Sequence, residues 1–295
     1  MKIVKVIGGL GNQMFQYALA LGLKKKFPSE RILLDLNHFK YYKAHNGFEL
    51  ERIFGLQYAR ASFLELIRVT NPYISYRINR LVKRLPTRST VCKEADGFPI
   101  DTTVLVEKGN RYFDGFWQHE EYFAHDADEV RKAFVFPEAN ERNLALIERM
   151  EKSESISLHV RRGDFLSLDL FNGICTLDYY RRAIAYMRQS VGTKGRILFC
   201  IFSDDIEWCR SNLSAEFLGC DVEYVDWNSG TESFRDMQLM SHCRHNVIAN
   251  SSFSWWGAWL NPNKGKIVVA PDRWLNYEGF NDPVVESWIR IKTKK

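Results

Sequence analysis

Apolar and polar residues follow two different arrangements along the chain. Before about residue 154, apolar runs of strand type mix with segments of helical spacing, which predicts strands near 2–7, 31–36, 104–107 and 111–117 and helices near 12–26, 60–68, 74–85, 119–134 and 140–151. After Glu154 the two types alternate regularly, with strands predicted at 155–161, 196–203, 221–226, 246–249 and 266–270 and helices at 177–190, 205–213, 231–243 and 252–260. Strands that alternate with helices of this length predict βαβ units and a parallel, doubly wound sheet. The expected fold class is therefore α/β.

A polar stretch at Lys152 and Ser153 separates the two arrangements. We expect an N-terminal Rossmann-like domain over residues 1–152 and a second one over residues 153–280. The remaining segment, 281–295, contains Val285, Trp288 and Ile289 at helical spacing, which predicts a helix over 283–291. Such a helix would bury its apolar side by packing back on the first domain.

The composition is that of an ordinary globular protein. The chain has 295 residues, 45% of them hydrophobic and 26% charged, which is enough to form two cores. No apolar run reaches the ~18 residues that a membrane-spanning helix needs, and the opening Met-Lys-Ile-Val-Lys is typical of a strand and not of a signal peptide. The six cysteines lack C-x-x-C spacing, which favours free thiols over a disulfide framework or a zinc site. These features predict a cytoplasmic protein.

Positive charge is concentrated in one segment. Between Leu66 and Lys93 there are seven Lys and Arg residues and no acidic residue, so the rest of the chain is slightly acidic. Apolar residues at helical spacing within this segment predict a basic amphipathic helix. Two interpretations remain open: a solvated surface helix, or contact of residues 72–88 with the inner face of an anionic membrane or with a phosphate-bearing, lipid-linked acceptor. A single short basic helix without a recognised motif does not favour nucleic acid as a partner.

The strand predicted at 155–161 leads into the most informative polar residues of the chain. Its apolar and polar positions alternate, and it ends in Arg161, Arg162, Gly163 and Asp164. In open α/β sheets, ligands bind outside the carboxyl ends of the strands. Arginine at that place suits phosphate, because the planar guanidinium donates two parallel hydrogen bonds and stays charged. The alternative interpretation is a surface ion pair at the end of a strand.

Two turns between a strand and a helix are further candidates for anion binding. Gly8-Gly9-Leu10-Gly11 precedes the first predicted helix, where glycines allow close approach of a ligand, although a tight turn without a ligand explains them equally well. Neither a third glycine nor Lys-Ser/Thr follows at the required spacing, which excludes a dinucleotide fingerprint and a P-loop. The serines at 251, 252 and 254 begin another predicted helix, whose first turn can also attract an anion.

Four motifs occur along the chain in a fixed order: Gly-Gly-Leu-Gly-Asn-Gln-Met-Phe-Gln at 8–16, His-Val-Arg-Arg-Gly-Asp at 159–164, Phe-Ser-Asp-Asp at 202–205, and Asn-Ser-Ser-Phe-Ser-Trp-Trp-Gly-Ala-Trp-Leu at 250–260. Together they resemble the bacterial α-1,2-fucosyltransferases of glycosyltransferase family 11, over residues 3 to about 270. The His-x-Arg-Arg element is shared with α-1,6- and protein O-fucosyltransferases, whereas the first and last motifs are specific to the α-1,2 group. Gly-Phe-Trp-Gln at 115–118 also resembles family sequence. The resemblance implies the GT-B architecture, in which two Rossmann-like domains face a cleft.

The resemblance also implies a reaction and a set of site residues. The reaction is an inverting transfer of L-fucose from GDP-fucose to the 2-hydroxyl of a terminal β-galactoside. In the family's pattern the first arginine of His-x-Arg-Arg, here Arg161, contacts the diphosphate. We expect the other donor contacts among Gly9, Gly11, Asn12, His159, Asp204, Asp205, Asn250, Ser251, Ser252, Phe253 and Ser254. The candidates on the acceptor side are Asp114, Trp117 and Gln118.

Several of these roles have alternatives. Related fucosyltransferases carry, at the position of Asp204 and Asp205, an acid that accepts hydrogen bonds from guanine. A metal site is disfavoured here because no third ligand is evident. A cap of the following helix remains an alternative. No metal or other cofactor is expected. Asp236 suits a ribose contact or a capping box with Ser233, and His159 suits a nucleotide contact or a core position.

The general base is the least constrained assignment. Asp164 is the first candidate, although an acid at that position can instead orient the arginines, and Asp114 is the second. Two other functions also remain open: fucosyl transfer with a different linkage, and a nucleotide-sugar or glycan-binding protein without turnover.

Overall fold

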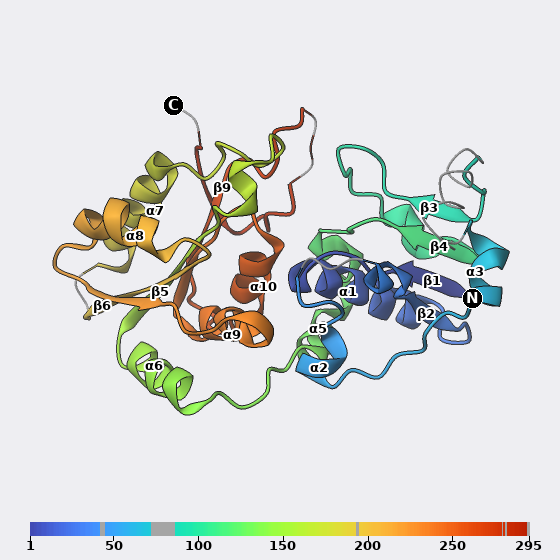
Figure 1. Cartoon of the computed structure of the whole chain (residues 1–295), viewed down its shortest axis with the longest axis horizontal. Helices are drawn as coiled ribbons and strands as arrows, with labels where there is room; N and C mark the ends of the chain where they lie inside the picture. Colours follow the sequence, from blue (N-terminus) through green and yellow to red (C-terminus); the bar gives the residue numbers. More distant parts are fainter. Residues whose placement is uncertain (42–44, 72–85, 193–194, 279, 281, 294–295) are drawn as a thin grey trace. The chain divides into compact units, whose positions relative to one another are not determined.

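The computed structural model describes residues 1–41, 45–71, 86–192, 195–278, 280 and 282–293. The chain divides into two compact units, Met1–Phe136 and Pro137–Lys295, and each is built on its own parallel sheet (Figure 1). The α/β class predicted from the sequence is confirmed.

The first unit is built on a four-stranded sheet in the order β2-β1-β4-β3. All its neighbouring strands are parallel: β1 (Lys2–Lys5), β2 (Ile32–Asp35), β3 (Val91–Lys93) and β4 (Arg111–Asp114). The connections carry the helices α1 (Leu10–Lys26), α2 (Leu50–Phe54), α3 (Phe63–Val69) and α5 (Ala127–Ala133), with short 3₁₀ turns η1 (Asn37–Lys40), η2 (Thr102–Val106), η3 (Glu120–Tyr122) and η4 (Ala124–Asp126). A capping box of Ser62 and Glu65 fixes the start of α3, whose Leu66 and Val69 pack against Ile3.

The second unit is built on a six-stranded sheet in the order β10-β9-β8-β5-β6-β7. Its strands are again parallel: β5 (Glu154–Val160), β6 (Ile197–Ser203), β7 (Asp221–Val225), β8 (His245–Val247), β9 (Val268–Pro271) and β10 (Ile289–Ile291). The strand order reverses between β5 and β8, since β6 and β7 extend the sheet on one side of β5 and β8 follows on the other. In sheets of this kind the crevice at such a switch point is where ligands bind.

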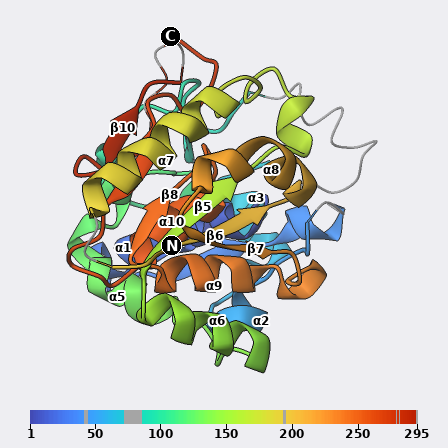
Figure 2. The same cartoon turned by 90° about the vertical axis from the view of Figure 1, so that its left-hand side faces the viewer.

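Helices cover both faces of the second sheet (Figure 2). They are α6 (Glu141–Glu151), α7 (Leu177–Val191), α8 (Ile206–Leu213), α9 (Phe234–His242) and α10 (Ser252–Leu260), with 3₁₀ turns η5 (Asp164–Leu166), η6 (Ser214–Phe217) and η7 (Gly230–Glu232). Alternation along β6 explains the two layers: Phe199 and Ile201 pack with α7 and α8, whereas Cys200 and Phe202 pack with α6 and α9. Both faces are buried, as parallel strands require.

The structure differs from the sequence prediction at four places. The chain divides after Phe136 and not at 152, because α6 packs on β6 and α9 within the second unit. The predicted helix over 283–291 is wrong: its last residues form β10, which pairs with β9 at the edge of the second sheet. The predicted strand at 104–107 is the 3₁₀ turn η2, and the helix predicted at 119–134 is shortened to α5 by two 3₁₀ turns.

Most of the basic segment 72–88, namely residues 72–85, lies outside the described residues. Among the helices that the structure describes, none combines the length and apolarity needed to cross a membrane.

Candidate functional site

Arg161 and two carboxylates form the centre of the polar cluster at the carboxyl end of β5. Arg161 Nη2 donates to Asp164 Oδ1 at 2.7 Å, and Nη1 lies 3.1 Å from Asp204 Oδ2. Asp164 follows in the same turn, whereas Asp204 comes from the end of the neighbouring strand β6. The Arg161 side chain is 28% exposed, so its guanidinium is held in position and still accessible. The structure therefore brings Arg161, Asp164 and Asp204 together at the carboxyl ends of two neighbouring strands, which is where ligands bind in open α/β sheets.

The Arg162 side chain has different partners from that of Arg161. Its Nε donates to Asp205 Oδ2 at 3.1 Å, and its guanidinium stacks on the Trp208 ring at 4.0 Å. Asp205 also caps α8, because its Oδ1 accepts from the Trp208 backbone N–H. A Cβ at Gly163 would lie 2.6 Å from Asp204 Oδ2, so a side chain there would displace the Asp204 carboxylate. Asp205 is thus the N-cap of α8, and Arg162 stabilises the turn.

His159 lies two residues before Arg161, near the end of β5, and is neutral at physiological pH. Burial and the adjacent Arg161 charge lower its pKa to about 3. Its ring packs 6.0 Å from that of Phe253 in the first turn of α10, and its buried Nδ1 has no hydrogen-bond partner among the described residues. A buried polar atom without a partner is costly, so this nitrogen is available to a ligand atom.

The start of α10 lies across the switch point from Arg161. Ser251 is the N-cap, and its hydroxyl accepts from the Phe253 backbone N–H at 3.3 Å. Asn250 is 2% exposed and donates through Nδ2 to the Trp274 carbonyl, while its Oδ1 has no partner in the described part of the chain. Ser252 lies in the first turn and Ser254 is 1% exposed. The first-turn N–H groups of α10 thus lie beside buried polar side chains, which suits an anion.

The glycine turn of the first unit is organised by buried amides. Gly8 has a positive φ of 80°, and α1 begins after Gly9, which acts as N-cap without a side chain. Gln13 Nε2 donates to the Gly8 carbonyl at 2.9 Å, and Asn12 Oδ1 accepts from Gln118 Nε2 at 2.6 Å. Two residues predicted for donor and acceptor contacts, Asn12 and Gln118, therefore bond to each other. The motif residues serve in part to hold the turn at the end of β1.

The other acceptor-side candidates have different surroundings. Asp114 accepts from Lys5 Nζ at 2.7 Å and is about one third exposed. Trp117 is 1% exposed with a φ of 56°, and its ring packs edge-on against Phe113 and Tyr122. Trp117 is a core residue of the first unit, so the face of its ring is not presented to an acceptor.

Glu94 is a carboxylate in the first unit that sequence reasoning missed. Its two oxygens accept from the backbone N–H groups of Phe116 and Trp117, at 2.6 and 3.1 Å. Burial is the main cause that raises its pKa to about 7. A Cβ at Gly115 would lie 2.8 Å from Glu94 Oε2, so the absence of a side chain at Gly115 leaves room for the Glu94 carboxylate. No sequence spacing links residue 94 to residue 115, which is why the pairing was not predicted.

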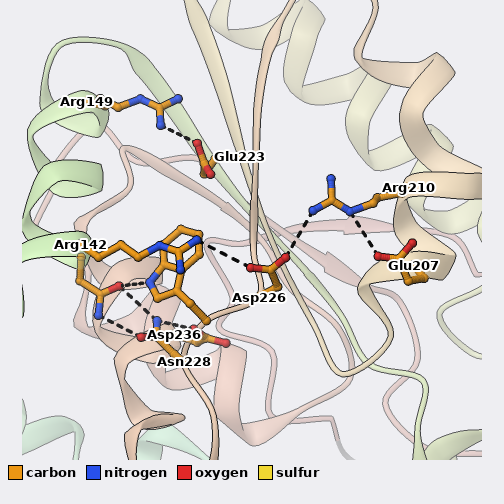
Figure 3. A network of polar contacts seen from close by, with 10 residues as sticks. Arg142, Arg149, Glu207, Arg210, Glu223, Asp226, Asn228 and Asp236 are labelled. Atoms are coloured by element: carbon orange, nitrogen blue, oxygen red, sulfur yellow. Dashed lines mark hydrogen bonds and ion pairs between the residues drawn. The ribbon is translucent and has the colours of Figure 1, made fainter.

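A second polar network surrounds the residues after β7 (Figure 3). Asp226 lies between Arg142 of α6 and Arg210 of α8, at 3.9 and 3.4 Å, and the Arg142 guanidinium stacks on Trp227 at 3.8 Å. Asp236 Oδ1 accepts from Asn228 Nδ2 at 2.9 Å, and burial raises its pKa to about 7. Ser233 makes no side-chain cap on α9, so the proposed capping box is absent there. The network ties α6, α8 and α9 to the end of β7.

Comparison with known proteins shows the class and the family of this α/β chain, which is a glycosyltransferase. The chain belongs to glycosyl transferase family 11, which it matches over residues 1–292. The α-1,2-colitosyltransferase of Escherichia coli is 34% identical, with 98% of both chains covered. The O-antigen biosynthesis glycosyltransferase WbnK of Escherichia coli is 31% identical, with 96% of this chain and 98% of that protein covered.

More distant relatives extend the comparison. Galactoside α-(1,2)-fucosyltransferase 1 of Leontocebus fuscicollis is 23% identical over 86% of this chain and 63% of that protein. Among solved structures, NodZ α-1,6-fucosyltransferase soaked with GDP-fucose has a TM-score of 0.51 at 12% identity, covering 94% of this chain and 96% of that one. A mutant of Arabidopsis thaliana FUT1 in complex with GDP also gives 0.51 at 12% identity, covering 91% and 70%. These neighbours show the fold, which is α/β of the GT-B type.

Proposed function

We propose that this protein is an inverting α-1,2-fucosyltransferase that moves L-fucose from GDP-fucose to the 2-hydroxyl of a terminal β-galactoside. The observation that carries the proposal is Arg161, held by Asp164 and Asp204 at the switch point of a family 11 chain. Two full-length relatives, at 34% and 31% identity, are named as glycosyltransferases, and the first of them as an α-1,2 enzyme. The guanidinium and the first turn of α10 would stabilise the negative charge that develops on the departing diphosphate.

In the proposed reaction the acceptor oxygen attacks the anomeric carbon while the bond to the diphosphate breaks. The hydroxyl proton must pass to a base, and we assign that role to Asp164, with Asp114 as the second candidate. Asp164 is about half exposed, so an acceptor can reach it. Its contact with Arg161 also suits a positioning role. An Asp164→Asn variant separates the two roles: loss of the base lowers kcat alone, whereas poorer positioning of Arg161 also raises the KM for the donor.

The donor side is assigned to the residues around the switch point and to the glycine turn. Asp204 and Asp205 each retain lone pairs that can accept from guanine beside the arginine contacts already described. His159, Asn250 and the serines at 251, 252 and 254 complete the proposed donor contacts in the second unit, and Gly9, Gly11 and Asn12 those in the first. We propose that the galactoside is recognised in part by Gln118.

The deciding experiment measures GDP release from GDP-fucose in the presence and absence of lactose. We expect lactose-dependent release and a product whose NMR spectrum shows an α-1,2 linkage. Binding of GDP-fucose without turnover would identify a binding protein instead, and a different linkage would overturn the regiochemistry. Because one relative is named as a colitosyltransferase, the same assay with GDP-colitose tests the donor sugar.

We further propose that transfer needs no metal ion or other cofactor, because arginine and helix N–H groups can meet the charge of the leaving group. Turnover should therefore survive excess EDTA. Loss of activity on chelation, with recovery on addition of Mg²⁺ or Mn²⁺, would refute this assignment.

A further inference from the structure

Arg273 has a buried hydrogen-bonding edge that no described residue uses. It follows Asp272 at the carboxyl end of β9. Its Nε and Nη2 are buried, and within the described residues neither has a hydrogen-bond partner. These two N–H groups point the same way and form one side of the guanidinium. They are the pair that a carboxylate or phosphate takes with two parallel bonds.

An unused edge of this kind is unfavourable in the ligand-free protein. Arginine stays protonated in proteins, so its burial cost cannot be relieved by loss of the proton. Buried charges are normally paired or hydrogen-bonded, and a charged donor that lacks a partner is more costly than a neutral one. Arg181, Arg188 and Arg196, from the same unit, all donate to acidic side chains or carbonyls. The unused edge therefore suggests a ligand with two oxygen atoms.

The sheet places Arg273 beside the candidate donor site. β9 pairs with β8, which pairs with β5, so the ends of β9 and β5 lie two strand spacings apart, about 10 Å. The first turn of α10 follows β8 between them. Asn250 joins the two loops directly, since its Nδ2 donates to the carbonyl of Trp274 at 3.0 Å. Its buried Oδ1 also lacks a partner among the residues that the structure describes. Arg161 and Arg273 thus flank the start of α10 from opposite sides.

We propose that Arg273 is a second guanidinium contact to the diphosphate of the nucleotide donor. The inference rests on the proposed function, because it takes the oxyanion to be that of a nucleotide diphosphate. The first turn of α10 and Arg161 would hold the same group from the other side. An acidic or phosphorylated acceptor offers the same oxyanion chemistry, and the experiment distinguishes these two sources.

The test measures GDP affinity by calorimetry for wild type, Arg273→Ala and Arg273→Lys. Loss of charge-assisted bonds should weaken GDP binding by about ten- to a hundredfold in Arg273→Ala. Lysine should restore little of it, because it lacks the paired donors. The ligand-free melting temperature of Arg273→Ala should stay equal or rise, since the variant removes two buried donors that have no partner in the described part of the chain. A merely structural arginine would instead lower the melting temperature and leave the affinity intact.

Arg290→Ala is the matched control. Arg290 lies on the neighbouring strand β10, and its Nη2 donates to Asp282 Oδ1 at 2.8 Å, so its removal should leave GDP affinity unchanged. GDP affinity of Arg273→Ala within twofold of wild type would overturn the proposal. So would an effect confined to the KM of a phosphorylated or acidic acceptor, which would assign the oxyanion to the acceptor. If wild type itself does not bind GDP, the proposed function fails as well; if Arg161→Ala loses GDP and Arg273→Ala does not, only this inference fails.

Discussion

Arg161 contacts two carboxylates in the ligand-free protein and is proposed to contact a diphosphate during catalysis. We expect Arg161→Ala to lower turnover about a hundredfold or more while the protein stays folded, because a phosphate contact of this kind contributes roughly 3 kcal/mol in the transition state. Arg161→Lys should not restore activity, since an ammonium group cannot form the two parallel bonds. The measurement is kcat at saturating GDP-fucose, with far-UV circular dichroism as the folding control. More than a tenth of wild-type turnover in the alanine variant would exclude the diphosphate role.

The adjacent acids Asp204 and Asp205 have different partners, which predicts different kinetic effects. Asp204 lies 3.1 Å from Arg161 and accepts from the Arg162 backbone N–H, so Asp204→Asn should mainly lower kcat through poorer placement of Arg161. The Asp205 side chain accepts from Arg162 and from the start of α8, and Asp205→Asn should mainly raise the KM for the donor if it binds guanine. Steady-state kinetics with varied GDP-fucose separates the two. Equal effects of both variants on both parameters would contradict this division.

At the scale of single elements, the C-terminal strand β10 completes the second unit. Trp288 precedes it, is 7% exposed and packs 5.6 Å from the ring of Trp255. Trp255 Nε1 in turn donates to the carbonyl of Pro283 at 2.7 Å, which ties the segment to α10. Trp288→Ala should therefore lower the free energy of unfolding by about 3 kcal/mol or more, as expected for a large buried side chain.

Chemical denaturation of Trp288→Ala checks this expectation, and Tyr277→Ala is the control. Tyr277 is 48% exposed, so its truncation should change stability by less than about 0.5 kcal/mol. If Trp288→Ala is as mild as the control, the C-terminal segment does not contribute to the second core.

At the scale of the whole molecule, buried carboxyl groups make stability depend on pH. Burial raises the pKa of Glu94 from 4.5 to about 7, so the folded protein binds its proton more tightly than the unfolded chain. The contribution of Glu94 to the free energy of unfolding therefore decreases as pH rises from about 4.5 to about 7 and is constant above that. Asp236 acts with the same sign between 3.8 and about 7, whereas His159, whose pKa is lowered to about 3, acts with the opposite sign below 6.5.

The variant Glu94→Gln isolates the first of these contributions. Relative to wild type, its free energy of unfolding should increase by about 2–3 kcal/mol between pH 5 and pH 8, because a shift of one pKa unit corresponds to about 1.4 kcal/mol. In the variant, the NH₂ group of glutamine faces a backbone N–H, which lowers the free energy of unfolding by the same amount at every pH. Asp236→Asn is the parallel variant in the second unit. A difference from wild type that is the same at both pH values would contradict the assigned pKa of Glu94.

Local sequence patterns predicted some elements well and others poorly. The long helices and paired strands after Glu154 were confirmed within one to three residues at most ends, because period-two and 3.6-residue patterns report burial on one side or both. The helix over 283–291 was not, since Val285, Trp288 and Ile289 fit a helix but a short apolar run also fits a strand. The free edge of β9 decided between them by offering parallel hydrogen-bond partners.

For this protein, the sequence alone determined the α/β class, the family motifs and the strand ends where chemistry is expected, because each depends on neighbouring residues. Only the tertiary structure decided that Asp164 and Asp204 both hold Arg161 and that Glu94 supports the Gly-Phe-Trp turn. It also decided that two donors of Arg273 find no partner within the described ranges. These contacts join residues that are far apart in the chain or depend on side-chain direction. Their energies arise from burial and from the pairing of charges, which exist only once the sheets have formed.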